Sequence, residues 1–188
     1  ELATEAGLPD GALNIVTGYG AEAGAALAAH PGVAHISFTG SVATGAMVQQ
    51  AAGRNVIPVT LELGGKSPQI VFADADLDAA LPFLVRAAIQ NAGQTCSAGS
   101  RVLIERPIFD HVAGLIAERF KALRVGAALT DPDLGPIINE KQRAGIRAMV
   151  EAAQKAGAPL IAEGEIEPTS PGGGYYVRPA LFGPVDPQ

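Results

Sequence analysis

The chain has 188 residues, of which 48% are hydrophobic and 17% are charged, and its formal net charge is −6. This length suffices for one ordinary domain, or for two partial ones with a sizeable core. A mildly acidic chain without a basic stripe argues against nucleic-acid binding, and no apolar run approaches the roughly 18 residues of a membrane span. One cysteine cannot form an internal disulfide, which fits a reducing compartment. We therefore expect a soluble, cytoplasmic protein.

Strand-like and helix-like segments alternate along the chain. In chain order the first half predicts the end of a helix at 1–6, a buried strand at 13–16 (LNIV), an Ala-rich helix that ends before Pro31, a strand at 34–38 (AHISF), a helix from Ser41 to about Gln50 and a strand at 56–63 (VIPVTLEL). Pro58 suits the start or edge of that last strand better than its centre.

The second half continues the alternation. It predicts a strand at 68–72 (PQIVF), a helix at 76–91, a strand at 101–105 (RVLIE), a helix opened by Pro107, a helix at 140–156, and strands at 159–164 (PLIAEG) and 175–182 (YYVRPALF). Such alternation indicates an α/β layered fold with a largely parallel sheet.

Two glycine-containing turns lie between a predicted strand and a predicted helix. GYGAEAG at 18–24 is close to a dinucleotide fingerprint, but no acidic residue for a ribose follows at 36–44. In FTGSVATG at 38–45, Gly40 would admit a ligand to the backbone and Ser41 would cap a helix whose N-terminus favours anions. Each pattern also fits an ordinary turn or helix start.

LELGGKSP at 61–68 places Glu62 at the carboxyl end of a strand, where open α/β sheets bind ligands. Burial beside apolar neighbours would raise the pKa of this carboxyl toward the range of a general base. The alternative is a solvated acid next to a turn.

The only cysteine, Cys96, lies in the stretch NAGQTCSAGSR at 91–101. A free cysteine is commonly an inert, buried residue. Here small polar residues and glycines flank it in a predicted loop, which favours an exposed and reactive thiol. The three histidines are scattered, so we expect no metal site.

These stretches together resemble one family. FTGS at 38–41, LELGGKSP at 61–68 and GQTCSAGSR at 93–101 are similar, in order and spacing, to motifs of the aldehyde dehydrogenase superfamily. GLPDGALNIVTGYG at 7–20 and YYVRPALF at 175–182 also read as family sequence. The resemblance covers essentially the whole chain and implies an αβα three-layer fold, with parallel sheets and flanking helices, that is incomplete here.

The resemblance implies a catalytic pair. Cys96 matches the nucleophile whose thiolate attacks an aldehyde, and its backbone N–H matches one donor to the oxyanion. Hydride transfer to NAD or NADP then leaves a thioester, and Glu62 matches the base that activates water to release a carboxylic acid. Family members that transfer the acyl group to coenzyme A commonly lack this glutamate, which favours hydrolysis.

The resemblance also implies cofactor contacts and domains. The matching positions are Gly20 near the adenosine, Phe38, Thr39, Gly40 and Ser41 around the pyrophosphate, and Leu63 and Gly64 beside the nicotinamide. Residues 1–64 match the C-terminal part of the NAD(P)-binding Rossmann-like domain, and residues 65–188 match the catalytic domain, C-terminally truncated. The parent enzyme would be a homo-oligomer.

The family's oxyanion asparagine, a ribose-binding lysine and a ribose-binding glutamate match no residue of this chain. We therefore expect a piece of an aldehyde dehydrogenase that carries Cys96 and Glu62 and does not turn over alone. Two other functions stay open: a non-catalytic binding or assembly module, and a cofactor-free thiol esterase.

Overall fold

The computed structural model describes residues 1–185, and the chain divides into two compact units at Gly64 and Gly65. None of the helices in the described part of the chain combines the length and the apolar character needed to cross a bilayer.

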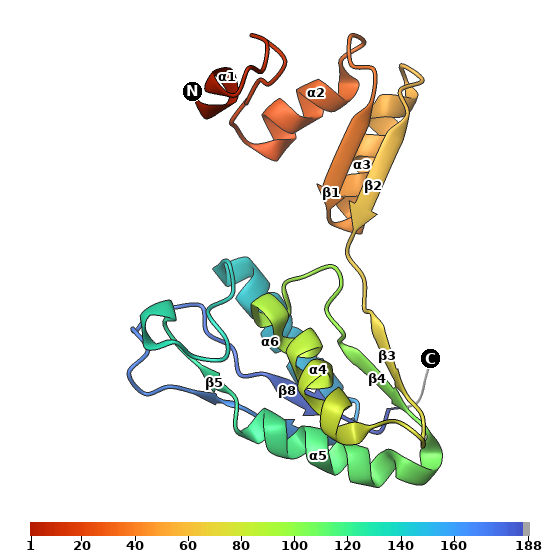
Figure 1. The fold of residues 1–188 in the computed structure, drawn as a ribbon, viewed down its shortest axis with the longest axis vertical. Coiled ribbons are helices and arrows are strands. Elements are labelled where there is room, and N and C mark those ends of the chain that lie inside the picture. Colours follow the sequence, from red (N-terminus) through yellow and green to blue (C-terminus); the bar gives the residue numbers. More distant parts are fainter. Residues whose placement is uncertain (186–188) are drawn as a thin grey trace. The chain divides into compact units, whose positions relative to one another are not determined.

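The first unit is built around a pair of parallel strands joined by a helix (Figure 1). Its elements are α1 (Leu2–Glu5), a π-helical turn (Gly20–Gly24) that continues into α2 (Ala25–Ala29), β1 (Ile36–Gly40), α3 (Val42–Gly53) and β2 (Val59–Leu63). Helix α3 connects the strands and packs against both of them and against α2. The strand, helix and strand predicted from residue 34 to residue 63 are confirmed, with boundaries shifted by a few residues.

The predicted buried strand at 13–16 is wrong. These residues form no regular structure, and the side chains of Leu13, Ile15 and Val16 are exposed. An apolar run becomes a strand only when a neighbouring strand supplies its hydrogen bonds. Residues 13–16 have no such neighbour in the described part of the chain.

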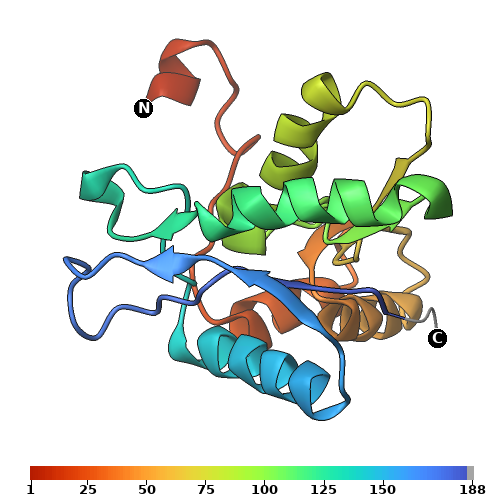
Figure 2. The same ribbon diagram turned by 90° about the horizontal axis from the view of Figure 1, so that it is seen from below.

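The described residues of the second unit form three α-helices and three further strand pairs. Its elements are β3 (Pro68–Val71), α4 (Leu77–Ile89), β4 (Arg101–Ile104), α5 (Phe109–Lys121), β5 (Arg124–Val125), α6 (Glu140–Lys155), β6 (Leu160–Glu163), β7 (Glu165–Ile166) and β8 (Ala180–Phe182), with 3-10 turns at Gln90–Gly93, Arg106–Ile108 and Ala128–Thr130. Helices α5 and α6 lie on opposite sides of β6 and β8 (Figure 2).

The α/β class is confirmed, but the pairing is not uniformly parallel. Pairs β3–β4 and β5–β7 are parallel, whereas β6–β8 is antiparallel. The strand predicted over 175–182 is too long, because only Ala180–Phe182 pair with a neighbour. Pro179 has no N–H to donate, and the Tyr175 carbonyl accepts a hydrogen bond from the loop residue Ile137.

The hydrophobic core of the second unit lies between α4, α5 and the strands. Its buried side chains are Val71, Leu81, Leu84, Val85, Val112, Ile116, Ala117, Phe120, Leu123, Val125, Leu134 and Ala162. Along α5 the buried residues recur at helical spacing, as Val112, Ile116 and Phe120 show. The core holds the amino end of the loop that contains Cys96, because that loop follows α4 directly.

Truncating Phe120 should destabilise this core strongly. Phe120→Ala removes a side chain that is 6% exposed, and we expect the free energy of unfolding to fall by about 3–5 kcal/mol. The matched control is Phe83→Ala, since Phe83 on α4 is 71% exposed. Urea unfolding of both variants measures the difference, and equal losses would contradict this description of the core.

Candidate active site

The carboxyl ends of β1 and β2 bring most of the predicted cofactor residues together. In the parallel register Thr39 lies opposite Glu62 and Gly40 lies opposite Leu63, so both strands end at the same edge. Phe38, Ser41 and Gly64 adjoin these positions in the chain. Ligands of open parallel sheets bind at such an edge. This arrangement therefore gathers Glu62 and the predicted pyrophosphate turn within one unit.

The N-terminus of α3 presents backbone donors at this edge. The Thr44 N–H donates to Ser41 Oγ at 3.2 Å, and the Gly45 N–H donates to the Ser41 carbonyl at 2.9 Å. The N–H groups of Val42 and Ala43 have no acceptor among residues 1–185. Ser41 is therefore the predicted N-cap, and the first turn keeps two free donors for an anion.

These residues fit the pyrophosphate of a dinucleotide. A Cβ atom built on the buried Gly45 would lie 2.7 Å from Leu63 Cδ2, which shows how closely α3 packs on β2. A glycine that permits close packing of helix on strand, after a turn with free N–H groups, matches what dinucleotide sites require. Gly20 begins the exposed π-helical turn before α2, and its predicted contact with adenosine stays a prediction.

Glu62 is exposed, so of the two interpretations open for its carboxyl the structure supports the solvated acid and not the buried one. Along β2 the side chains alternate, and the face of Leu63 packs against α3 at Gly45. Glu62 therefore lies on the opposite face. The cross-strand neighbour Thr39 is also exposed. An accessible carboxylate at this edge can still accept a proton from water.

Cys96 is exposed at the tip of a tight turn in the second unit. The chain leaves α4 through Asn91, Ala92 and Gly93, which all have positive φ values of 50°, 54° and 76°. A hydrogen bond of 3.1 Å from the Ala98 N–H to the Thr95 carbonyl then closes the turn around Cys96. The expectation of an exposed thiol in a loop is confirmed.

The backbone N–H of Cys96 is a candidate donor to a bound ligand. Within residues 1–185, the Cys96 N–H donates to no acceptor. A free backbone donor next to a nucleophilic sulfur is the arrangement that an oxyanion needs. Gly65 lies beside this turn, since a Cβ built on it would be 3.8 Å from the Cys96 carbonyl oxygen. Arg101 Nε also donates to the Lys66 carbonyl at 2.8 Å, so residues 65–67 lie against the cysteine loop.

Two side-chain carboxamides that hold this loop were not predicted from the sequence. Gln69 on β3 donates to the Gly99 carbonyl at 2.8 Å, and Gln94 accepts from the Ile138 N–H at 2.9 Å. Both contacts join residues at least 30 positions apart. Only the polarity of residue 69 within an otherwise apolar strand could have pointed to the first of them.

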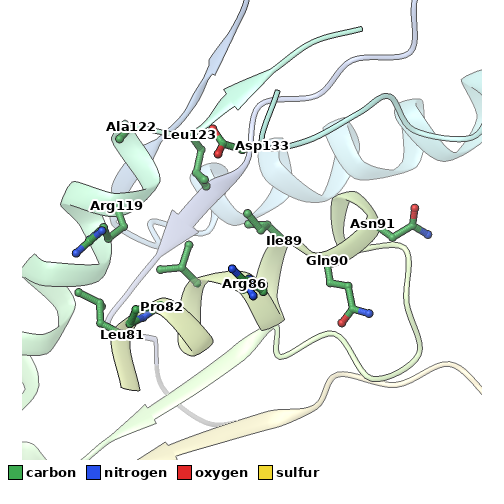
Figure 3. Close-up of a pocket in the computed structure, with 11 residues that line it drawn as sticks. Leu81, Pro82, Arg86, Ile89, Gln90, Asn91, Arg119, Ala122, Leu123 and Asp133 are labelled. Carbon is green, nitrogen blue, oxygen red and sulfur yellow. The ribbon is translucent and has the colours of Figure 1, made fainter. Parts of the chain in front are cut away.

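A shallow cavity of about 490 Å³ was also not predicted (Figure 3). Its walls are Leu81, Pro82, Val85, Arg86, Ile89, Gln90 and Asn91 of α4 and the turn after it, together with Arg119, Ala122, Leu123 and Asp133. Charged side chains of both signs line it, namely Arg86, Arg119 and Asp133. Leu81 and Ile89 make part of it apolar.

Among residues 1–185 no three His, Cys, Asp or Glu side chains gather as a possible metal site. Glu62 belongs to the first unit and Cys96 to the second. The partnership of these two residues is therefore a matter for proposal.

Comparison with known proteins places these features in a family. The chain is 43% identical over 188 residues to aldehyde dehydrogenase, cytosolic 1, of Macroscelides proboscideus, which covers 98% of the chain and 36% of that protein. It superposes with a TM-score of 0.94 on a crystal structure from Burkholderia cenocepacia assigned as an aldehyde dehydrogenase, at 61% identity, over 96% of the chain and 38% of that protein.

A second solved structure is an aldehyde dehydrogenase C mutant from Pseudomonas syringae in complex with NAD+ and octanal. It has a TM-score of 0.87 and 44% identity, and the match covers 98% of the chain and 38% of that protein. The chain thus spans little more than a third of the length of these proteins. The model of the aldehyde dehydrogenase family matches residues 1–188, and the chain therefore belongs to the aldehyde dehydrogenase family.

Proposed function

We propose that the chain takes part in the NAD(P)-dependent oxidation of an aldehyde to a carboxylic acid, with Cys96 as the nucleophile and Glu62 as the base for hydrolysis. The observation that carries the proposal is the turn at Cys96. It combines the only thiol of the chain, an exposed position and an N–H without an acceptor in the described residues.

The first chemical step belongs to Cys96. Its thiolate forms an S–C bond to the aldehyde carbon, and the carbonyl electron pair moves onto the oxygen. The Cys96 N–H stabilises that oxyanion by donating to it. Bound NAD or NADP supplies the acceptor for the hydride that leaves when the carbonyl re-forms. Cys96 then holds the acyl group as a thioester.

The second step belongs to Glu62. Its carboxylate takes a proton from water as the water oxygen attacks the thioester carbon, and the C–S bond breaks to return the Cys96 thiolate. The exposed position of Glu62, at the same sheet edge as Thr39 and Gly40, supports this role because water reaches the carboxylate there.

Cofactor binding is proposed at the β1–α3 turn. The free N–H groups of Val42 and Ala43, the cap at Ser41 and the close packing at Gly45 support a pyrophosphate there. We further propose Gly20, Phe38, Thr39, Leu63 and Gly64 as contacts to the rest of the cofactor. The Pseudomonas syringae relative, solved in complex with NAD+, supports the choice of a nicotinamide cofactor. No metal is required by these steps.

The two units receive separate roles in this proposal. Residues 1–64 would be part of the NAD(P)-binding domain, and residues 65–188 would be part of the catalytic domain. The boundary between the compact units supports this division. A cytoplasmic location and a homo-oligomeric parent enzyme complete the proposal, and the relative named as cytosolic supports the first of these.

Absorbance of the reduced nicotinamide tests the proposed chemistry. The 188-residue chain is mixed with NAD or NADP and a panel of small aldehydes in single-turnover amounts. Since the chain is not expected to turn over alone, we expect at most one equivalent of reduced nucleotide per chain, formed only when aldehyde is present. Hydrolysis of simple esters that is insensitive to nucleotide, without any nucleotide reduction, would favour the thiol esterase and contradict the proposal.

A further inference from the structure

Two side-chain amides hold the loop around Cys96, one on each side of the thiol. On the carboxyl side, Gln69 Nε2 donates to the Gly99 carbonyl at 2.8 Å and to the Leu84 carbonyl of α4 at 3.0 Å. The loop thereby gains a link to both β3 and α4, three residues after Cys96.

The lack of a side chain at Gly99 leaves room for the Gln69 amide. A Cβ built on Gly99 would lie 2.6 Å from Gln69 Cδ and Nε2, so the amide occupies the space that any other side chain would need. The Gly99 N–H also donates to the Ala87 carbonyl at 2.9 Å. Both backbone groups of Gly99 are therefore bonded, one to Gln69 and one to α4.

On the amino side, Gln94 uses both ends of its amide. Gln94 Oε1 accepts from the Ile138 N–H at 2.9 Å, and its Nε2 donates to the Asn91 carbonyl at 3.0 Å. This link lies two residues before Cys96 and joins the loop to the segment that precedes α6. Only a group with a donor and an acceptor can make both bonds.

The position of Gln69 is unusual for a polar residue. Gln69 and Val71 share one face of β3, because side chains two positions apart point the same way. Val71 is buried in the core and Gln69 is half-buried opposite Val102 of β4. An apolar residue would avoid the cost of desolvating an amide at such a site. Instead, Gln69 Nε2 donates to the carbonyls of both Leu84 and Gly99.

We propose that Gln69, together with Gln94, is a positioning residue that fixes the Cys96 N–H relative to the Cys96 sulfur. The inference rests on the proposed role of Cys96 as nucleophile. A free N–H stabilises an oxyanion only when it is already held where the charge develops. The turn at 95–98 has one internal hydrogen bond, and the two amides hold its ends to β3, α4 and the 136–138 segment.

Two reactions of the Cys96 thiol distinguish a change in the position of its backbone N–H from a change in the accessibility of its sulfur. p-Nitrophenyl acetate transfers its acetyl group to the sulfur through an oxyanion and releases p-nitrophenolate, whereas iodoacetamide alkylates the sulfur without forming an oxyanion. Because Cys96 is the only cysteine, both reactions report on one site, with Cys96→Ala as the background. A positioning residue should affect the first reaction much more than the second.

The test variant is Gln69→Met, which keeps the length of the side chain and removes both donated hydrogen bonds. We expect its acylation by p-nitrophenyl acetate to slow by about 10- to 100-fold, the usual effect of a small misplacement, while alkylation is unchanged. Gln154→Met is the matched control, since Gln154 is exposed on α6. Hydrogen exchange of residues 94–100 should be faster in Gln69→Met and unchanged in Gln154→Met.

Three outcomes would overturn the inference: no change in acylation, an equal change in acylation and alkylation, or unchanged hydrogen exchange at 94–100. If the wild-type chain is not acylated at all, the proposed role of Cys96 fails, and the exchange rates still decide whether Gln69 holds the loop. If Gln69→Met does not fold, Gln94→Ala replaces it, with the same selective loss of acylation expected and the same three outcomes against it.

Discussion

Cys96→Ala should abolish the chemistry of the chain. Nucleotide reduction with aldehydes and p-nitrophenolate release from p-nitrophenyl acetate should both fall by roughly 10⁴-fold or more, to background, because alanine has no group that forms a bond to the carbonyl carbon. Rapid mixing with absorbance detection measures both reactions on the same preparation.

The binding of nucleotide should not change in this variant. Every residue proposed to contact the cofactor lies between Gly20 and Gly64, in the other unit. Calorimetric titration with NAD and NADP checks this, and Ser100→Ala provides a control for a small change within the same loop. Residual reduction above background in Cys96→Ala would remove Cys96 from the nucleophile's role.

Glu62→Gln should separate the two halves of the reaction. Glutamine has the size of glutamate but accepts no proton at neutral pH, so acyl transfer to Cys96 should proceed while hydrolysis of the thioester slows by about 10²–10⁴-fold. Mass spectrometry of the intact chain at increasing times after acylation measures how long the acyl group persists.

Glu5→Gln, an exposed change in α1 of the same unit, should leave that lifetime unaltered. A lifetime in Glu62→Gln equal to that of the wild-type chain would show that another group activates the water. Loss of acyl transfer in Glu62→Gln would instead show that the carboxylate acts before the thioester exists.

The elements around the site were predictable because their signals are local. The cap at Ser41 and the β-branched strand that carries Glu62 near its carboxyl end each depend on a few adjacent residues, and the structure has both. The loop at Cys96 was recognisable for the same reason, from glycines and small polar residues between a helix and a strand.

Features that depend on distant partners were missed. LNIV at 13–16 has the composition of a strand, yet its pairing depends on a neighbour that the local sequence cannot reveal. The exposure of Glu62 depends on which face of β2 packs against α3. That packing is a contact between separate elements, so the residues next to Glu62 do not reveal it. The hydrogen bonds of Gln69 and Gln94 span 30 and 44 positions, and no short motif encodes contacts of that range.

The identity of the covalent intermediate tests the central claim most directly. The Glu62→Gln chain, in which the thioester should persist, is mixed with an aldehyde and NAD or NADP, quenched in acid, digested and analysed by mass spectrometry. We predict one acyl group per chain, on the peptide that contains Cys96, formed only when both aldehyde and nucleotide are present. Reduced nucleotide without an acyl group on Cys96, or an acyl group on another residue, would contradict the account.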